Sequence, residues 1–189
     1  MSIKLPGATN GSVEIDVPAA IGSDVSVTIP GAAGTLDRLE RAGNILQVVS
    51  AETSTEVTNA LASFEDTGLS ATITPTSVSS KILIMIDQQF EATRSGSAAG
   101  VGLNVVRNST TIHSAATTAG GPVTLYVAEA TQIYARVQMT ILDSPASTSA
   151  VTYKTQGRPS FATSSGVVNF QKNTNIDGVS RLILMEVAG

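Results

Sequence analysis

The fold of this chain is decided by the stretch QIYARVQMTIL, residues 132–142. Apolar side chains stand at every second position from Ile133 to Ile141. This period of two predicts a β-strand with one buried face and one solvated face. Strand-like segments separated by turn signals such as Asp66-Thr67-Gly68 recur along the chain. They are residues 45–51, 57–64, 69–73, 81–90, 101–107, 110–114, 123–128, 151–156, 167–171 and 181–187. This recurrence predicts an all-β fold, an antiparallel β-sandwich of the jelly-roll kind.

One predicted strand does not alternate. Ile82 to Ile86 are apolar without interruption, and Ile183 to Met185 have the same character. Such a run is typical of a strand buried on both faces, which lies either centrally in the sandwich or against a neighbouring subunit.

Composition excludes several classes of function. Apolar residues make up 42% of the chain and charged residues 14%, which leaves few charges to keep an isolated subunit soluble. The net charge is −4 and the basic residues are spread singly, so we expect no nucleic-acid partner. No apolar run approaches the roughly 20 residues that span a bilayer, so we expect no membrane insertion. The chain has no cysteine.

The first 34 residues carry a repeat. Val13, Ile15, Val17 and Pro18 recur 12 residues later as Val25, Val27, Ile29 and Pro30. Six apolar side chains supply about 12 kcal/mol if buried, whereas ordering about 20 residues costs roughly 30 kcal/mol. We therefore expect an assembly arm that is ordered only against neighbouring subunits or a larger partner.

A short linker helix is expected to follow the repeat. Thr35 can cap a two-turn helix that ends at Ala42, and Gly43 can stop it. The chain then divides into an attachment and trimerisation arm, residues 1–42, and a β-sandwich, residues 43–189. The residues expected to form the assembly interface are Val13, Ile15, Val17, Val25, Val27, Ile29, Leu36 and Leu39.

Residues 43–189 also resemble a known module. The segments that carry the resemblance are GNILQVV (43–49), DTGL (66–69), SKILI (80–84), LDSP (142–145) and LILMEV (182–187). They look like a module of structural, tail-fibre-like virion proteins of tailed bacteriophages, especially phages of aquatic cyanobacteria. The resemblance implies a virion component and brings no catalytic residues with it.

The residues themselves offer little chemistry. His113 is the only histidine and there is no thiol, so neither a metal site of the usual kind nor a Ser-His-Asp triad can be assembled. The carboxylates that could hydrolyse a glycan are scattered over turns and strand ends: Glu52, Glu56, Glu65, Asp66, Asp87 and Glu91. Asn173, Asn175 and Asp177 alternate as in a calcium loop but equally suit a turn. We predict no catalytic residue, cofactor or metal.

The leading hypothesis is a non-enzymatic bacteriophage virion protein, made in the host cytoplasm. It would form a homotrimeric surface appendage that binds other tail or capsid proteins and contacts a glycan or protein on the host surface. One alternative is a capsid decoration protein that stabilises the head. An alternative of another class is a monomeric carbohydrate-binding module. Its aromatic platform would come from Tyr126, Tyr134, Tyr153, Phe161 or Phe170.

Overall fold

The computed structural model describes residues 3–6, 12–15, 41–95, 99–114, 124–128, 131–160, 165–173 and 178–189. The chain divides into two compact units, Met1–Asp37 and Arg38–Gly189. Within the first unit, β1 (Ile3–Pro6) pairs antiparallel with β2 (Ser12–Ile15). The strand β2 coincides with the start of the first repeat copy, whereas β1 was not predicted. The second copy and residues 35–40 of the expected helix lie outside the described residues, and Arg41 and Ala42 form a bend and a turn.

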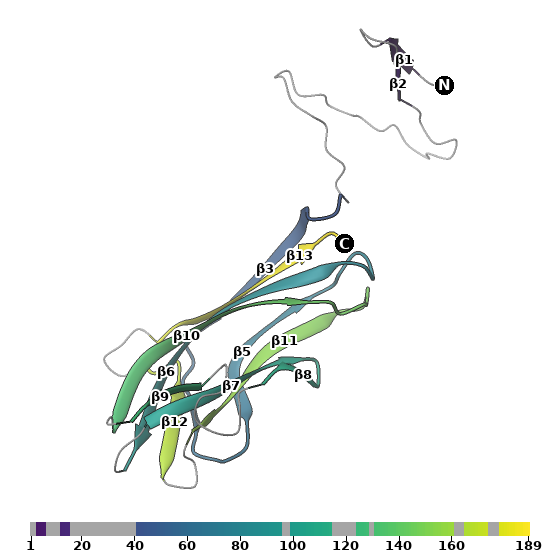
Figure 1. Ribbon diagram of the computed structural model, residues 1–189. Coiled ribbons are helices and arrows are strands. Elements are labelled where there is room, and N and C mark those ends of the chain that lie inside the picture. Colours follow the sequence, from purple (N-terminus) through teal and green to yellow (C-terminus); the bar gives the residue numbers. More distant parts are fainter. Residues whose placement is uncertain are drawn as a thin grey trace. The chain divides into compact units, whose positions relative to one another are not determined.

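The second unit is a sandwich of two antiparallel sheets (Figure 1). The first sheet contains β3 (Ile45–Thr53), β13 (Ser180–Val187), β6 (Lys81–Arg94), β10 (Gln132–Asp143), β12 (Gly166–Phe170) and β4 (Val57–Asn59). The second contains β5 (Glu65–Ile73), β11 (Val151–Pro159), β7 (Ala99–Arg107), β8 (Thr110–His113) and β9 (Thr124–Val127). The all-β sandwich expected from the sequence is confirmed, and each predicted strand of residues 43–189 has a counterpart.

The largest boundary error concerns the segment 57–64, of which only Val57–Asn59 is strand. The side chain of Asn59 ends the strand, because its Oδ1 accepts a hydrogen bond from the Leu61 amide at 2.7 Å. Its Nδ2 donates to the Ser63 carbonyl oxygen at 3.0 Å. An asparagine that bonds to the backbone two and four residues ahead holds a turn in place of a strand.

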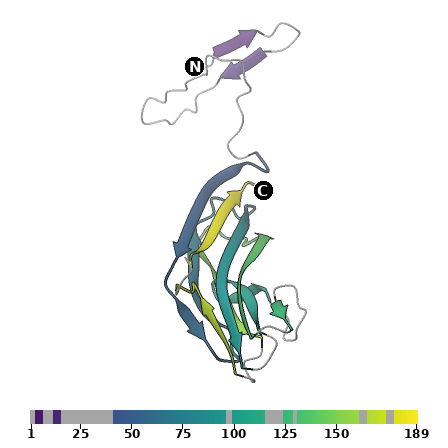
Figure 2. The same cartoon turned by 90° about the vertical axis from the view of Figure 1, so that its left-hand side faces the viewer.

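Strand β6 is the centre of the first sheet. Along one edge it pairs with β10 from Ile82 to Thr93. Along the other edge it pairs first with β13 and then with β12. Figure 2 shows β3, β13, β6 and β10 side by side, in that order across the sheet. Of the two positions expected for the Ile82–Ile86 run, the structure shows the central one, between β10 and β13.

The core consists of two apolar clusters with a polar layer between them. The first cluster surrounds Ile84, Leu184 and Tyr153, and the second surrounds Phe90 and Phe170. The buried side chains of the polar layer are those of Thr67, Gln88, Thr155 and Ser180. Their mutual hydrogen bonds satisfy the polar atoms that the two sheets bury there.

Within a single chain the Ile82–Ile86 run is buried on one face only, and its expected burial on both faces stays a prediction that depends on a neighbouring subunit. Ile82, Ile84 and Ile86 point into the core and are at most 4% exposed. Met85 points the other way and is 39% exposed. A single chain covers one face of β6 with its second sheet, and the described residues leave the other face accessible.

Candidate assembly surface

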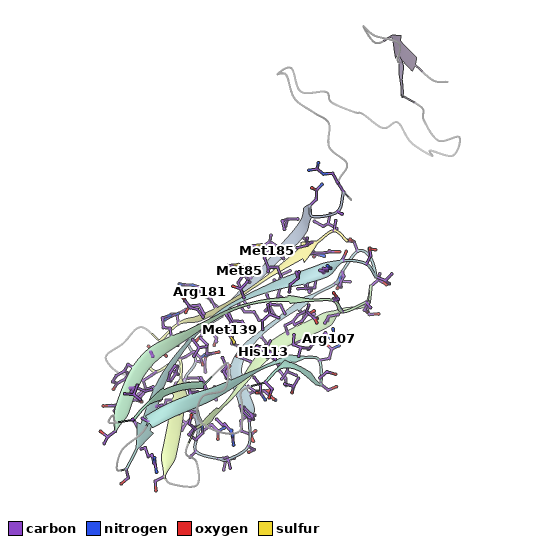
Figure 3. The ribbon with its side chains drawn as sticks, in the orientation of Figure 1. Met85, Arg107, His113, Met139, Arg181 and Met185 are labelled. Atoms are coloured by element: carbon purple, nitrogen blue, oxygen red, sulfur yellow. The ribbon has the colours of Figure 1, made fainter. Side chains whose placement is uncertain are left out.

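The most unusual surface of the sandwich is the solvent side of its first sheet. Successive residues of a strand point to opposite faces, so the residues between the core positions of β3, β13, β6 and β10 point outward. We call the surface that they form the outer face. Figure 3 labels three of its side chains, Met85, Met185 and Arg181, along one side of the sandwich. The inward-facing Met139, which packs against both core clusters, is labelled in the same view.

Strand register aligns the outward side chains in rows across the sheet. Val48 lies opposite Met185, Met185 opposite Leu83, and Leu83 opposite Leu142. This first row is apolar on all four strands. Its two ends are the most accessible, with Val48 56% and Leu142 55% exposed.

The second row contains Ser50, Ile183, Met85 and Thr140 in the same strand order. Together with the third row it lines a shallow depression of about 390 Å³. The outward-facing residues around this depression are Met85, Asp87, Gln138, Thr140, Arg181 and Ile183. Its lining combines the apolar Met85 and Ile183 with the charged Asp87 and Arg181.

The third row is charged but balanced. Arg181 Nε lies 3.1 Å from Glu52 Oε2, and both side chains are more than half exposed. One row further along β10, Arg136 forms a bidentate pair with Asp87, with Nε 2.7 Å from Oδ1 and Nη2 2.8 Å from Oδ2. Each carboxylate of this strip therefore has a guanidinium partner, and the strip as a whole is close to neutral.

The solvent side of the second sheet has the opposite character. Thr72 and Thr152 lie opposite each other with their hydroxyl oxygens 2.7 Å apart. Lys154 Nζ is 2.7 Å from Asp66 Oδ2, and Gln156 Nε2 donates to Asp66 Oδ1 at 2.8 Å. Although burial opposes the shift, these two hydrogen bonds hold the pKa of Asp66 below its usual value. This second surface is suited to water.

The difference between the two surfaces has an energetic consequence. Six apolar side chains lie in the first two rows of the outer face: Val48, Leu83, Met85, Leu142, Ile183 and Met185. If half of each is already covered, removing the rest from water would contribute roughly 6 kcal/mol per copy. A contiguous apolar patch with a polar rim is the usual mark of a protein interface. We take the outer face as the candidate functional site.

The carboxylates proposed for glycan cleavage are each engaged by neighbouring side chains. Glu52, Asp66 and Asp87 are in the pairs described above, Glu56 bonds Lys172 at 3.0 Å, and Glu65 accepts from Ser63 at 2.7 Å. The sixth, Glu91, is only 4% exposed. It accepts hydrogen bonds from Asn169 at 2.7 Å and Gln132 at 2.5 Å. Against the effect of burial, these bonds lower its pKa and favour its charged form.

The next residues to locate are the histidine and the asparagine-rich segment that the sequence offered as candidate metal ligands. His113 ends β8, as expected of a strand residue. Asn173 bonds backbone and side-chain atoms of Ser54 and Glu56, while Asn175 and Asp177 lie outside the described residues. In the part of the chain that the structure describes, no three histidine or acidic side chains group as metal ligands would. Nor does any helix in that part have the length and apolar character needed to cross a membrane.

The aromatic platform required of a carbohydrate-binding module is not assembled by the described side chains. Tyr153 and Phe170 are core residues, at 0% and 1% exposure. Burial and a hydrogen bond to Asp143 raise the pKa of Tyr153. Tyr134 is exposed on β10, and the side chains of Tyr126 and Phe161 are not among those described. Two of the five proposed aromatic residues are therefore excluded by burial.

Sequence reasoning placed the assembly interface in the arm. Of its residues, Val13 and Ile15 lie on β2, opposite Leu5 and Ile3. The remaining ones, Val17, Val25, Val27, Ile29, Leu36 and Leu39, lie outside the described residues. The outer face was missed as a site, although the non-alternating runs at Ile82–Ile86 and Ile183–Met185 were its signal. Only the strand register shows that these two runs share a face with Val48 and Leu142.

Comparisons with known proteins add little to this picture. No family model and no curated protein matches the chain. Among solved structures, it is similar to a chain in "Structure of infectious bursal disease virus Gx strain", with 17% identity and a TM-score of 0.27 over 98% of this chain. It is also similar to a chain in the corresponding Gt strain structure, with 16% identity and a TM-score of 0.25 over 97% of this chain. This chain spans 46% of the length of each. We take the function from the residues of the chain itself.

Proposed function

We propose that this chain is a non-enzymatic structural subunit of a virus particle, a tail-fibre-like appendage of a tailed bacteriophage that works as a homotrimer. The observation that carries the proposal is the contrast between the two solvent sides of the sandwich. One side is hydroxylated and charged, and the other has a row that is apolar on all four strands. A subunit of a permanent assembly needs this asymmetry, because one side faces water and the other faces a partner.

The virion part of the proposal comes from the resemblance carried by the segments within residues 43–189. The assignment as a structural protein is supported by the way the chain uses its acidic residues. Glu56, Asp66, Asp87 and Glu91 are held by lysine, arginine or amide partners within the sandwich. For Asp66 and Glu91 these partners lower the pKa against the effect of burial, whereas a general acid needs a raised pKa.

The structural role is favoured over the carbohydrate-binding module by the burial of Tyr153 and Phe170. Sugar-binding platforms need aromatic rings that are open to solvent. The apolar side chains in the first two rows of the outer face are aliphatic residues and methionine, which suit contact with another protein surface.

Native mass spectrometry of the purified full-length chain tests the oligomeric part of this proposal. We expect a mass of three chains at micromolar concentration, and a monomer would contradict it. Immunogold labelling of intact phage particles with an antibody against the sandwich tests the virion part. Label confined to the tail supports the appendage. Label spread over the head would replace it with the decoration protein, and particles free of label would refute both.

A further inference from the structure

We propose that three copies of this chain bury their outer faces around a threefold axis that runs along the strands, with the β3 border of one copy against the β10 border of the next. This rests on the trimer of the proposed function and names the surface that forms it. The occupant of the outer face is therefore a second and a third copy of the chain itself.

The width of the outer face fits this arrangement. Four strands spaced about 4.8 Å apart give a face about 19 Å wide. Three such faces that close a triangular prism place each sheet roughly 5.5 Å from the axis, which is close to half the roughly 10 Å separation of packed sheets. Side chains from the three faces would then meet at the axis without a central void and without overlap.

The rows of outward side chains can align between neighbouring copies in a cyclic trimer. Copies related by a rotation axis are not shifted along it, so equal rows of neighbouring copies stand at equal height. The apolar end of the first row at Val48 then meets the apolar end at Leu142. In the second row Ser50 meets Thr140 in the same way. At each corner of the prism an apolar side chain therefore meets an apolar side chain in the first row, and a hydroxyl meets a hydroxyl in the second row.

Charge is complementary at the same corners. On the β3 border, Glu52 has a side chain that is 63% exposed although it already contacts Arg181. On the β10 border, Gln138 stands in the same row and Arg136 one position further. A carboxylate has room for more than one donor, so Glu52 can accept from the neighbour's border. The third row can therefore add a hydrogen bond between Gln138 and Glu52 at each corner of the trimer.

Disulfide trapping tests this arrangement. The chain has no cysteine, so a Val48→Cys, Leu142→Cys double variant carries only the two introduced thiols. Within one copy the two positions lie three strand spacings apart, about 14 Å, so they cannot bridge each other. Between neighbouring copies they meet at the corner. We expect mild oxidation of the full-length variant to give a covalent species of three chains on a non-reducing gel.

A second double variant, Ser50→Cys with Thr140→Cys, probes the next row. Both of its positions are polar and exposed, so this variant should fold even if the Val48→Cys, Leu142→Cys variant does not. A control with Val48→Cys and Thr72→Cys places the second thiol on the opposite solvent side and should give no covalent trimer. A ladder that stops at two chains overturns the threefold arrangement. No cross-link from either folded pair, in a chain that native mass spectrometry shows to be a trimer, overturns the surface but leaves the trimer. A monomeric unmodified chain overturns both.

Discussion

The side-chain amide of Gln88 donates a hydrogen bond to Ser180 Oγ over 2.9 Å in the middle of the sandwich. The same Gln88 accepts through Oε1 from Thr155 at 2.8 Å and from Thr67 at 3.2 Å. All four side chains are fully buried. The layer that they form links β5, β6, β11 and β13, and so joins both sheets at the level where the apolar core is interrupted.

Gln88→Leu should therefore destabilise the sandwich although it adds an apolar side chain to a buried site. The change removes the shared acceptor of the Thr67 and Thr155 hydroxyls. These two hydroxyls also bond each other, so one of their two hydrogens is left without an acceptor. We expect a loss of about 1–3 kcal/mol in the free energy of unfolding, measured by urea denaturation. A triple variant that adds Thr67→Val and Thr155→Val should recover part of the loss. If the single variant is as stable as the unmodified protein, the layer contributes no specific stability.

Glu186 should make stability depend on acid pH. It is fully buried and accepts hydrogen bonds from Gln47 Nε2 at 2.5 Å and from the Thr76 amide and hydroxyl at 2.7 Å each. Burial alone would raise the pKa of Glu186, but these bonds outweigh it and lower the pKa to about 2. Between the usual carboxyl pKa near 4.5 and this value, the unfolded chain binds the proton and the folded chain does not. The stabilisation is therefore complete above about pH 4.5 and is lost as pH falls toward 2.

Glu186→Gln is the matching variant. It removes the charge and places amide hydrogens against the donors of Gln47 and Thr76, which should cost about 2 kcal/mol at pH 7. It should also flatten the fall in melting temperature between pH 5 and pH 2, because the titrating group is gone. Glu65→Gln, at an exposed position of β5, serves as the control and should leave that slope in place. Equal slopes for Glu186→Gln and the unmodified protein would show that another group carries the acid dependence.

The strands could be predicted from the sequence because alternation is a local property, as in residues 132–142. Their order could not, since nothing local states that β6 lies between β10 and β13. The same limit applies to Gln88 and to Met85. Nothing local to Gln88 signals its burial, because its partners Thr67 and Thr155 lie 21 and 67 positions away in the sequence. Met85 reads as core until the outer face is seen to lack a covering layer among the described residues.

Replacing Gly157 with alanine should lower the stability of the sandwich. A Cβ at this position would lie 2.1 Å from Cζ of Phe170, a ring that is 1% exposed in the second core cluster. Gly157→Ala must push this ring or the strand aside, at a cost of about 1–3 kcal/mol measured by thermal or urea unfolding. Adding Phe170→Leu should restore part of the loss by making room. Gly43→Ala is the contrasting variant, because a Cβ there would meet no atom within 4 Å and only the φ of +91° opposes the change. A Gly157→Ala protein as stable as the unmodified one would show that Phe170 relocates freely.

Removing residues 1–34 should leave the sandwich folded but prevent its incorporation into particles. Among the described residues, the two apolar clusters of the sandwich draw all their buried members from residues 69–184, which lie outside the arm. By contrast, the 12-residue repeat cannot offset its own ordering cost and must obtain its burial from neighbours. We expect an unchanged melting temperature and a loss of the protein from purified particles, measured by quantitative mass spectrometry.

A gentler form of the same test replaces Val27 and Ile29 with aspartate in the full-length chain. A buried charge without a partner costs several kcal/mol in an assembled state and almost nothing in a segment exposed to water. The matched control places aspartate at Ser26 and Thr28, the intervening positions that the alternation assigns to the solvated side. Only the first variant should fail to enter particles, while both keep the melting temperature of the sandwich. If the sandwich of the first variant melts much lower, the repeat belongs to the core of the sandwich, and the division of the chain before Gly43 is wrong.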